Sequence, residues 1–355
     1  MPAALGSERR NRFVLERLLK ELPLITERFG WPWTLAGQPM QAATCTQHEE
    51  YPRITVVTPS YNQGEFLEET LRSVLLQGYP HLEYIVIDGG STDDSVAIIR
   101  KYERWITHWV SEKDRGQCHA INKGMERATG DILCWLNSDD TFEPEALHAV
   151  AAHFRANPDW QALTGGCYFI DAQGGYLHAG SRQPVPGLRP PESVCRTPKA
   201  SGRETFTHWF RHWFPQSSTF WRRCLWQRSG PLNETLYYSM DYELWRRMGA
   251  HAEIHVVPEI LSNYRFQDDA KCMRNHWGPS REVLSVNARE MTDAEFRRYA
   301  EDMIGFLLDQ LDRQDQRYVY VQQMMAQFLA SRRYKLGSTI LAPLTAIARS
   351  LKGWL

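Results

Sequence analysis

The sequence lacks a net charge, a regular cysteine framework and a long apolar run. Its 41 lysines and arginines nearly balance 42 aspartates and glutamates, so no overall field would gather nucleic acid. The seven cysteines contain no CxxC pair, which argues against a disulfide scaffold and favours reduced thiols in a cytoplasmic setting. We find no stretch that could cross a bilayer and expect no secretory leader near the first residues.

What the sequence does contain is an alternation of short apolar runs and helical repeats. With 355 residues, 43% of them hydrophobic, the chain can bury the core of an enzyme. The alternation predicts an α/β fold with a mainly parallel sheet and helices on its faces. The expected strands and helices occupy residues 54–57, 66–75, 84–87, 95–102, 108–110, 118–128 and 132–136.

Polar clusters follow three of the expected strands. They are Pro59 to Asn62, Asp88 to Asp93 and Asn137 to Asp140. In parallel sheets ligands bind beyond the carboxyl ends of the strands, because loops and helix N-termini converge there. The sequence therefore predicts a binding site at this edge of the sheet.

Adjacent carboxylates at Asp139 and Asp140 form the strongest single feature. Two such groups repel each other unless a cation shares them. Hard oxygen ligands suit Mg²⁺ or Mn²⁺, and either ion can bridge the phosphates of a nucleotide. A solvated turn or a helix cap is the alternative interpretation of the pair.

Three further residues are candidates for contacts with a nucleotide. Asp88 follows a strand and precedes two glycines, so it could bind a base or ribose, although a capped turn would look similar. Tyr61 could stack on a base or simply pack half-buried. Arg115 lies before an expected helix start, where an anionic ligand would also feel the helix dipole, but a surface ion pair is equally compatible.

The second half of the chain ends in helical sequence. Thr292 and Glu295 have the spacing of a capping box at a helix start. From Ser331 onward, basic and apolar residues alternate without any acid, which is typical of an interfacial membrane anchor. Core packing or a dimer contact is the alternative for this tail.

The motifs together resemble those of the family 2 glycosyltransferases. The matching stretches are TPSYNQGEFLEETLRSVLLQGYP, VIDGGSTDDS and SEKDRGQCHAINKGMERATGDILCWLNSDD. The resemblance covers residues 53–155 closely and continues faintly to about residue 270, where FPQSSTFWRR resembles the acceptor-side strand and SMDYELWRRM the helix of the catalytic carboxylate. It implies the Rossmann-like GT-A fold and metal-dependent, inverting transfer of a sugar from a nucleotide diphosphate to an acceptor hydroxyl.

The resemblance also implies roles for single residues. Tyr61 and Asp88 would hold the base, Asp139 the ribose, Asp140 the Mn²⁺ or Mg²⁺ ion, and Asp241 would act as general base. We place Pro59 and Arg115 with the nucleotide-binding residues, with Arg115 stabilising the departing diphosphate.

Two points near the proposed catalytic groups stay open. Glu243 is the nearest rival of Asp241 as base, and an N-cap role is the structural alternative for Asp241 itself. Family members often carry a histidine soon after the Tyr-Arg dipeptide that follows the last core strand. Here Gln267 stands there, and His276 is a nearby substitute.

By this resemblance the chain divides into four parts. They are an N-terminal helix and linker (1–50), a nucleotide-sugar-binding half (51–155), an acceptor-binding half (156–270) and a C-terminal helical extension (271–355). The expected donor is a UDP-sugar and the expected acceptor a glycan or a lipid-linked sugar, with peripheral contact of the tail at the inner face of the membrane. The alternative is a sugar-nucleotide-binding or scaffold protein with little turnover. A nicotinamide-dependent oxidoreductase is disfavoured, because no GxGxxG follows the first strand.

Overall fold

The computed structural model describes residues 14–25, 28–34, 51–177, 194–195, 214–267, 271, 278–299 and 301–302. The chain forms two compact units, Met1–Met273 and Arg274–Leu355. The first unit carries the sheet and all of the described site residues.

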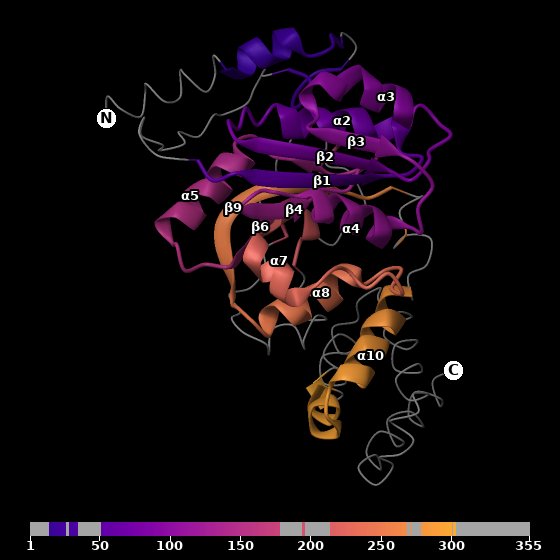
Figure 1. Cartoon of the computed structure of the whole chain (residues 1–355), viewed down its shortest axis with the longest axis vertical. Coiled ribbons are helices and arrows are strands. Elements are labelled where there is room, and N and C mark those ends of the chain that lie inside the picture. Colours follow the sequence, from indigo (N-terminus) through magenta and orange to yellow (C-terminus); the bar gives the residue numbers. More distant parts are fainter. Residues whose placement is uncertain are drawn as a thin grey trace. The chain divides into compact units, whose positions relative to one another are not determined.

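A single sheet organises the first unit (Figure 1). Its first half is the parallel arrangement that the sequence predicts, in the order β3-β2-β1-β4. Apolar β-branched side chains fill these strands, and every residue of β1 is buried, as expected for strands covered on both faces. The four strands are β1 (Ile54–Ser60), β2 (Leu82–Asp88), β3 (His108–Ser111) and β4 (Ile132–Trp135).

The second half of the sheet is mixed. β8 runs antiparallel to β4 and β6, whereas β9 lies parallel to β6 and antiparallel to β5. The antiparallel pairing of β4 with β8 ends the series of parallel neighbours that the crossover helices create. The additional strands are β5 (Thr141–Phe142), β6 (Ala162–Ile170), β7 (Val194–Cys195), β8 (Thr219–Arg222) and β9 (Ile254–Arg265).

Helices cover both faces of the parallel half. Figure 1 shows α2 and α3 on one side of the sheet and α4 on the other. Helix α4 approaches β1 closely at Gly124, where a Cβ atom would lie 2.4 Å from Cγ1 of Val57, so the approach requires glycine. Besides the helical residues 14–21, the described part of the first unit contains α2 (Gly64–Leu75), α3 (Ser95–Tyr102), η1 (Glu103–Trp105), α4 (Gln117–Arg127), α5 (Ala146–Ala156), η3 (Gln216–Ser218), α7 (Arg223–Ser229) and α8 (Met240–Gly249).

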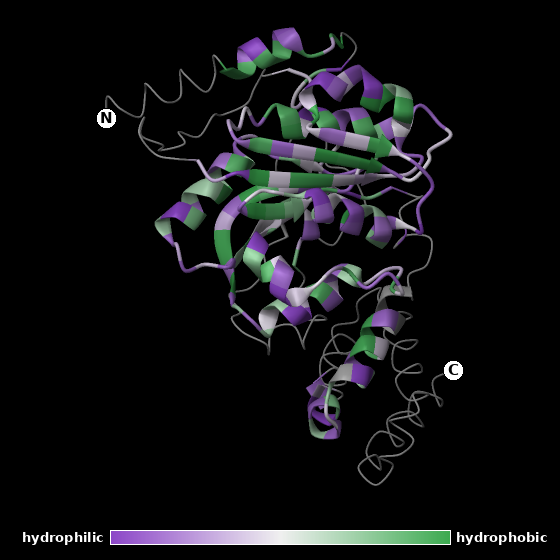
Figure 2. Cartoon of the chain, viewed as in Figure 1, coloured by the Kyte–Doolittle hydropathy of each residue, from purple (hydrophilic) through white to green (hydrophobic). Residues whose placement is uncertain are grey.

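The N-terminal residues 14–25 and 28–34 pack against helix α2. Arg72, a buried residue of α2, donates to the carbonyl oxygens of Pro23 (3.0 Å) and Pro32 (3.3 Å) and to the Tyr102 hydroxyl (3.2 Å). Leu22 and Trp33 of the segment are buried as well. The central strands are largely hydrophobic while the helices also present hydrophilic faces, which places the core between these layers (Figure 2).

In the second unit, α10 (Gly278–Glu290) precedes a second helical stretch from residue 293 to 299. The predicted capping box is confirmed: Glu295 accepts hydrogen bonds from the backbone N–H and the hydroxyl of Thr292, which in turn accepts from the Glu295 N–H at 3.3 Å. Across the described ranges, no helix combines the length and apolar character that a bilayer span requires. The tail from Ser331 onward and His276 lie outside the described residues.

His148 on α5 makes the stability of the fold depend on pH. Its ring lies edge-on to Tyr51 and Tyr79, and the Glu145 carboxylate, at 3.6 Å, is too far for a hydrogen bond. Burial lowers the pKa of His148 from 6.5 to about 4. Because the unfolded chain takes up a proton at a higher pH than the folded chain does, this group's contribution to stability is present above pH 6.5 and is lost as the pH falls toward 4.

We therefore expect His148→Phe, which keeps an aromatic ring in place, to reduce the loss of unfolding free energy between pH 7 and pH 5 by about 2 kcal/mol. Urea unfolding at the two pH values measures this difference. An unchanged pH dependence in the variant would mean that other groups cause the acid sensitivity.

Candidate active site

The carboxyl ends of the parallel strands meet at one edge of the sheet. Asp88, the last residue of β2, is paired in register with Ser60 of β1 and with Ser111 of β3. Its buried carboxylate accepts hydrogen bonds from the Ser111 hydroxyl (2.6 Å), the Ser91 hydroxyl (2.5 Å) and the backbone N–H groups of Gly90 (3.1 Å) and Ser91 (2.9 Å). Asp88 thus shapes the turn after β2. Oδ1 receives a single one of these four bonds and retains capacity for a ligand, so its contact with a base stays a prediction.

The loop after β1 presents an aromatic ring. Tyr61 is 60% exposed, whereas Pro59 is buried within β1, just before the loop. Asn62 ties this loop to the next one, since its N–H donates to the Ser91 hydroxyl (2.8 Å) and its Oδ1 accepts from the Thr92 N–H (2.8 Å). The exposed ring on an anchored loop is compatible with the predicted stacking on a base.

The acidic pair is arranged asymmetrically. Asp140 is buried, and its two oxygens accept hydrogen bonds from the backbone N–H of Arg265 (3.0 Å) and the amide of Asn137 (3.3 Å). Asp139 is half-buried and accepts from the Gln267 amide (2.9 Å) through Oδ2. Its Oδ1 has no hydrogen bond with any other residue that the structure describes. The open oxygen of the pair therefore belongs to Asp139.

Burial and mutual repulsion disfavour the ionised forms of the two carboxylates. Burial raises the pKa of Asp139, and it raises that of Asp140 well above the usual range with help from the neighbouring charge of Asp139. Within the described ranges, no three histidine, cysteine, aspartate or glutamate side chains cluster as a metal site. The residues fit an ion that is held by one or two carboxylates and completed by substrate phosphates, as is usual for Mg²⁺.

Gln267, which stands where a histidine is common, contacts the pair through its amide. Besides the bond to Asp139, the same amide nitrogen lies 3.3 Å from Oε1 of Gln63 in the loop before α2. Gln267 thus orients Asp139 rather than offering a ligand nitrogen.

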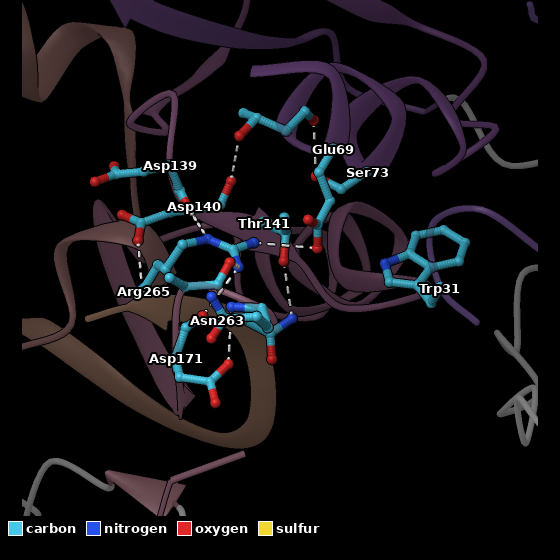
Figure 3. A network of polar contacts seen from close by, with 12 residues as sticks. Trp31, Glu69, Ser73, Asp139, Asp140, Thr141, Asp171, Asn263 and Arg265 are labelled. Carbon is cyan, nitrogen blue, oxygen red and sulfur yellow. Dashed lines mark hydrogen bonds and ion pairs between the residues drawn. The ribbon is translucent and has the colours of Figure 1, made fainter. Parts of the chain in front are cut away.

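Arg265, the last residue of β9, holds the acidic pair from beneath (Figure 3). Its buried guanidinium donates to the carbonyl oxygens of Asp139 (2.7 Å), Asp171 (3.0 Å) and Ala172 (3.1 Å) and lies 3.1 Å from the Glu69 carboxylate of α2. In the sequence, Arg265 is noticeable only as the second residue of the Tyr-Arg dipeptide before Phe266 and Gln267. Its role was missed because its partners are mostly main-chain carbonyls, which leave no signal in the sequence.

Arg265→Lys should cost about 3 kcal/mol of unfolding free energy, because lysine keeps the charge but cannot satisfy three carbonyls and a carboxylate at once. Arg28→Lys is the matched control, since Arg28 is half exposed and lies 3.9 Å from the same Glu69; we expect a change below about 0.5 kcal/mol there. Urea unfolding measures both. Equal small effects would show that the Arg265 contacts contribute little.

Two cations lie near the start of α4. Arg115 is exposed and forms an ion pair with Glu234 (2.9 and 2.8 Å), which is the surface-pair alternative; its role toward a diphosphate stays a prediction. Lys271, which the sequence analysis missed, donates to Oε1 of Gln117 (2.9 Å), and the Gln117 amide donates to Oδ1 of Asn137 (2.7 Å). A second positive charge thus lies two side chains away from Asp140.

The structure separates the two candidates for the base. Asp241 is the second residue of α8, after the N-cap residue Ser239, so the N-cap alternative for Asp241 is wrong. It is half-buried, and its Oδ1 accepts from the Tyr242 N–H (2.7 Å). Glu243 is buried and bound by Arg247 through both oxygens (2.7 and 2.8 Å). Glu243 therefore stabilises α8, and the role of Asp241 as base stays a prediction.

The parallel half of the sheet, its polar carboxyl edge and the mixed second half define the GT-A class of α/β proteins. Staphylococcus aureus TarS, solved with UDP-GlcNAc, superposes with a TM-score of 0.52 at 16% identity over 70% of this chain and 71% of that one. The predicted GT-A fold is thereby confirmed.

Sequence comparison matches part of the chain to a known family. Residues 55–212 match the model of glycosyl transferase family 2, which confirms the resemblance seen in the motifs. An uncharacterized glycosyltransferase of Mycobacterium tuberculosis is 44% identical over 92 residues, 26% of this chain and 35% of its own length. The putative teichuronic acid biosynthesis glycosyltransferase TuaG of Bacillus subtilis is 39% identical over 99 residues, 27% and 39% of the two chains. The chain thus matches little more than a third of these relatives' length.

Proposed function

We propose that the protein is a metal-dependent, inverting glycosyltransferase that moves a sugar from a UDP-sugar to an acceptor hydroxyl of a glycan or a lipid-linked sugar. The observation that carries the proposal is the asymmetry of the acidic pair. Both carboxylate oxygens of Asp140 accept hydrogen bonds from the protein, while Asp139 keeps an open oxygen at the carboxyl edge of the sheet. Such an arrangement suits an ion shared between one carboxylate and a diphosphate.

Each residue of the site then has its own proposed role. Tyr61 stacks on the base and Asp88 accepts a hydrogen bond from it, while Asp139 contacts the cation and Asp140 holds the loop. The proposal thus moves the ion from Asp140, where the resemblance places it, to Asp139, and it assigns no residue to the ribose. When bound, Mg²⁺ or Mn²⁺ takes up negative charge on the leaving diphosphate. Arg115 is available for the same task once it leaves Glu234.

Asp241 is the proposed general base. In an inverting transfer the acceptor oxygen bonds to the anomeric carbon as the bond from that carbon to the diphosphate oxygen breaks. The acceptor proton passes to the Asp241 carboxylate, so no covalent sugar–enzyme intermediate is needed. The place of Asp241 in the first turn of α8 favours its ionised form through the helix dipole.

Several comparisons support the choice of substrates. TarS has been solved with UDP-GlcNAc and with UDP, and TuaG carries a name from teichuronic acid biosynthesis. A UDP-sugar donor and a cell-envelope glycan acceptor are consistent with these names. We place the activity in the cytoplasm, with the basic tail after Ser331 contacting the inner face of the membrane. Liposome sedimentation of the full chain and of a tail-deleted chain tests that contact.

Calorimetry with UDP, GDP and dTDP, each with Mn²⁺ and with EDTA, tests the donor class. UDP should bind most tightly and more tightly with Mn²⁺, and UDP-GlcNAc should be hydrolysed slowly in the same buffer. Tight binding without any release of UDP, across a panel of UDP-sugars and glycan acceptors, would favour the alternative of a non-catalytic sugar-nucleotide-binding protein. Equal weak binding of all three nucleotides would refute the donor assignment.

A further inference from the structure

Four buried tryptophans meet beneath the proposed active site. Trp245 of α8 stacks on Trp135 of β4, with ring centroids 5.6 Å apart and planes inclined by 16°. Trp221 of β8 lies edge-on to both, at 5.4 Å in each case, and Trp226 of α7 stacks on Trp221 at 6.2 Å. Trp135 and Trp221 are wholly inaccessible to solvent.

The stack joins the two elements that carry the proposed chemistry. Trp245 lies four residues after Asp241, about one helical turn along α8. Trp135 ends β4 and precedes Asp139 by four residues, and its carbonyl accepts from the Gln216 amide (2.7 Å), whose oxygen accepts from Asn137 (3.0 Å). The Trp135 ring therefore lies at the root of the loop that holds the acidic pair.

Other contacts hold α8 to different parts of the chain. Arg247 joins the helix to the carbonyls of Gly230 (3.0 Å) and Pro231 (2.9 Å), which belong to the segment directly before it. The loop that leads into α8 is fixed to α4, because Asn122 exchanges two hydrogen bonds with the backbone of Leu232 (2.9 and 3.0 Å). Among the described ring contacts, the Trp135–Trp245 stack joins the helix directly to β4.

Ring contact accounts for this tie, since the indole N–H groups of Trp135 and Trp221 have no hydrogen-bond partner among the described residues. Stacked and edge-on aromatic pairs have specific geometry and therefore constrain both the separation and the rotation of the elements that carry them. A displacement of a catalytic group by about 1 Å can cost roughly 100-fold in rate.

We infer that Trp245 is a positioning residue: through its stack on Trp135 it sets the place of the Asp241 carboxylate relative to the acidic pair. The inference rests on the proposed function. It concerns the acceptor side of the reaction, so it predicts an effect on turnover and none on the binding of the donor.

Trp245→Leu and Trp226→Leu form a matched pair for the test. Both remove a buried indole of the same cluster, but the described ring contact of Trp226 is with Trp221 and not with Trp135 or Trp245. We expect both variants to lower the melting temperature. Trp245→Leu alone should reduce UDP release from saturating UDP-GlcNAc, by about 100-fold, while UDP affinity measured by calorimetry stays within twofold of wild type. Trp245→Phe, which keeps an aromatic ring, should recover most of the rate.

A double-mutant cycle with Asp241→Asn isolates the route of the effect. If Trp245 acts through Asp241, Trp245→Leu should reduce the residual rate of the Asp241→Asn variant by less than threefold. In the wild-type background the same substitution should have its full effect of about 100-fold. Equal losses of rate in Trp245→Leu and Trp226→Leu, or a full additive loss in the cycle, would overturn the inference and leave the function standing. Wild-type rates in Asp241→Asn would instead remove the proposed base, whatever the tryptophan variants show.

Discussion

Asp241→Asn should lower sugar transfer by about 10²- to 10⁴-fold, the range that a general base contributes. The amide has nearly the shape of the carboxylate and keeps an oxygen that can accept from the Tyr242 N–H, so α8 should keep its structure. It cannot take the proton of the acceptor hydroxyl. Binding of UDP and Mn²⁺, for which the proposal uses Tyr61, Asp88 and Asp139 and not Asp241, should stay normal in calorimetry.

Glu243→Gln is the control on the same helix turn. It weakens the two-point ion pair with Arg247, so we expect a loss of stability of about 1–3 kcal/mol and a smaller loss of turnover than in Asp241→Asn. Steady-state UDP release and urea unfolding separate these outcomes. A larger loss of turnover in Glu243→Gln than in Asp241→Asn, with both variants folded, would make Glu243 the base.

The acidic pair should give the second large effect, divided between its two members. Asp139→Asn should abolish most of the gain in UDP affinity that Mn²⁺ provides, about 10- to 100-fold or roughly 1.4–2.8 kcal/mol, with an unchanged melting temperature. The reason is that Asp139 supplies the open oxygen, whereas its bonded oxygen can be replaced by that of an amide.

Asp140→Ala should behave in the opposite way. Its removal leaves the buried backbone N–H of Arg265 and the Asn137 amide without their carboxylate, which should cost about 1–3 kcal/mol of unfolding free energy. Calorimetry at several Mn²⁺ concentrations and thermal unfolding of both variants test the division. The opposite result would be that Asp140→Ala loses the Mn²⁺ effect while remaining as stable as wild type, and that Asp139→Asn keeps the effect. The ion would then be held by Asp140, as the family resemblance implies, and not by Asp139.

Local sequence patterns predict the secondary structure of residues 54–136 well. The strands and helices expected between residues 54 and 136 agree with β1 to β4 and α2 to α4 to within a few residues, because each depends on local periodicity and on the turn residues that follow it. The polar clusters at strand ends could be predicted to meet for a related reason. Parallel strands place all of their carboxyl ends at one edge, whatever the side chains do afterwards.

Which polar atoms are available for chemistry depends on contacts between segments that are far apart in the chain. Asp139 and Asp140 are adjacent and chemically identical in the sequence, and they differ because β9 brings the Arg265 N–H to one and Gln267 to the other from more than 120 residues away. Glu243 is bound by Arg247 and Arg115 by Glu234, so the partner present in space decides how each charge is used. The tryptophan stack joins β4 to α8 across a separation of about 110 residues in the chain. Such contacts depend on which surfaces fold against each other, and local sequence carries no record of that choice.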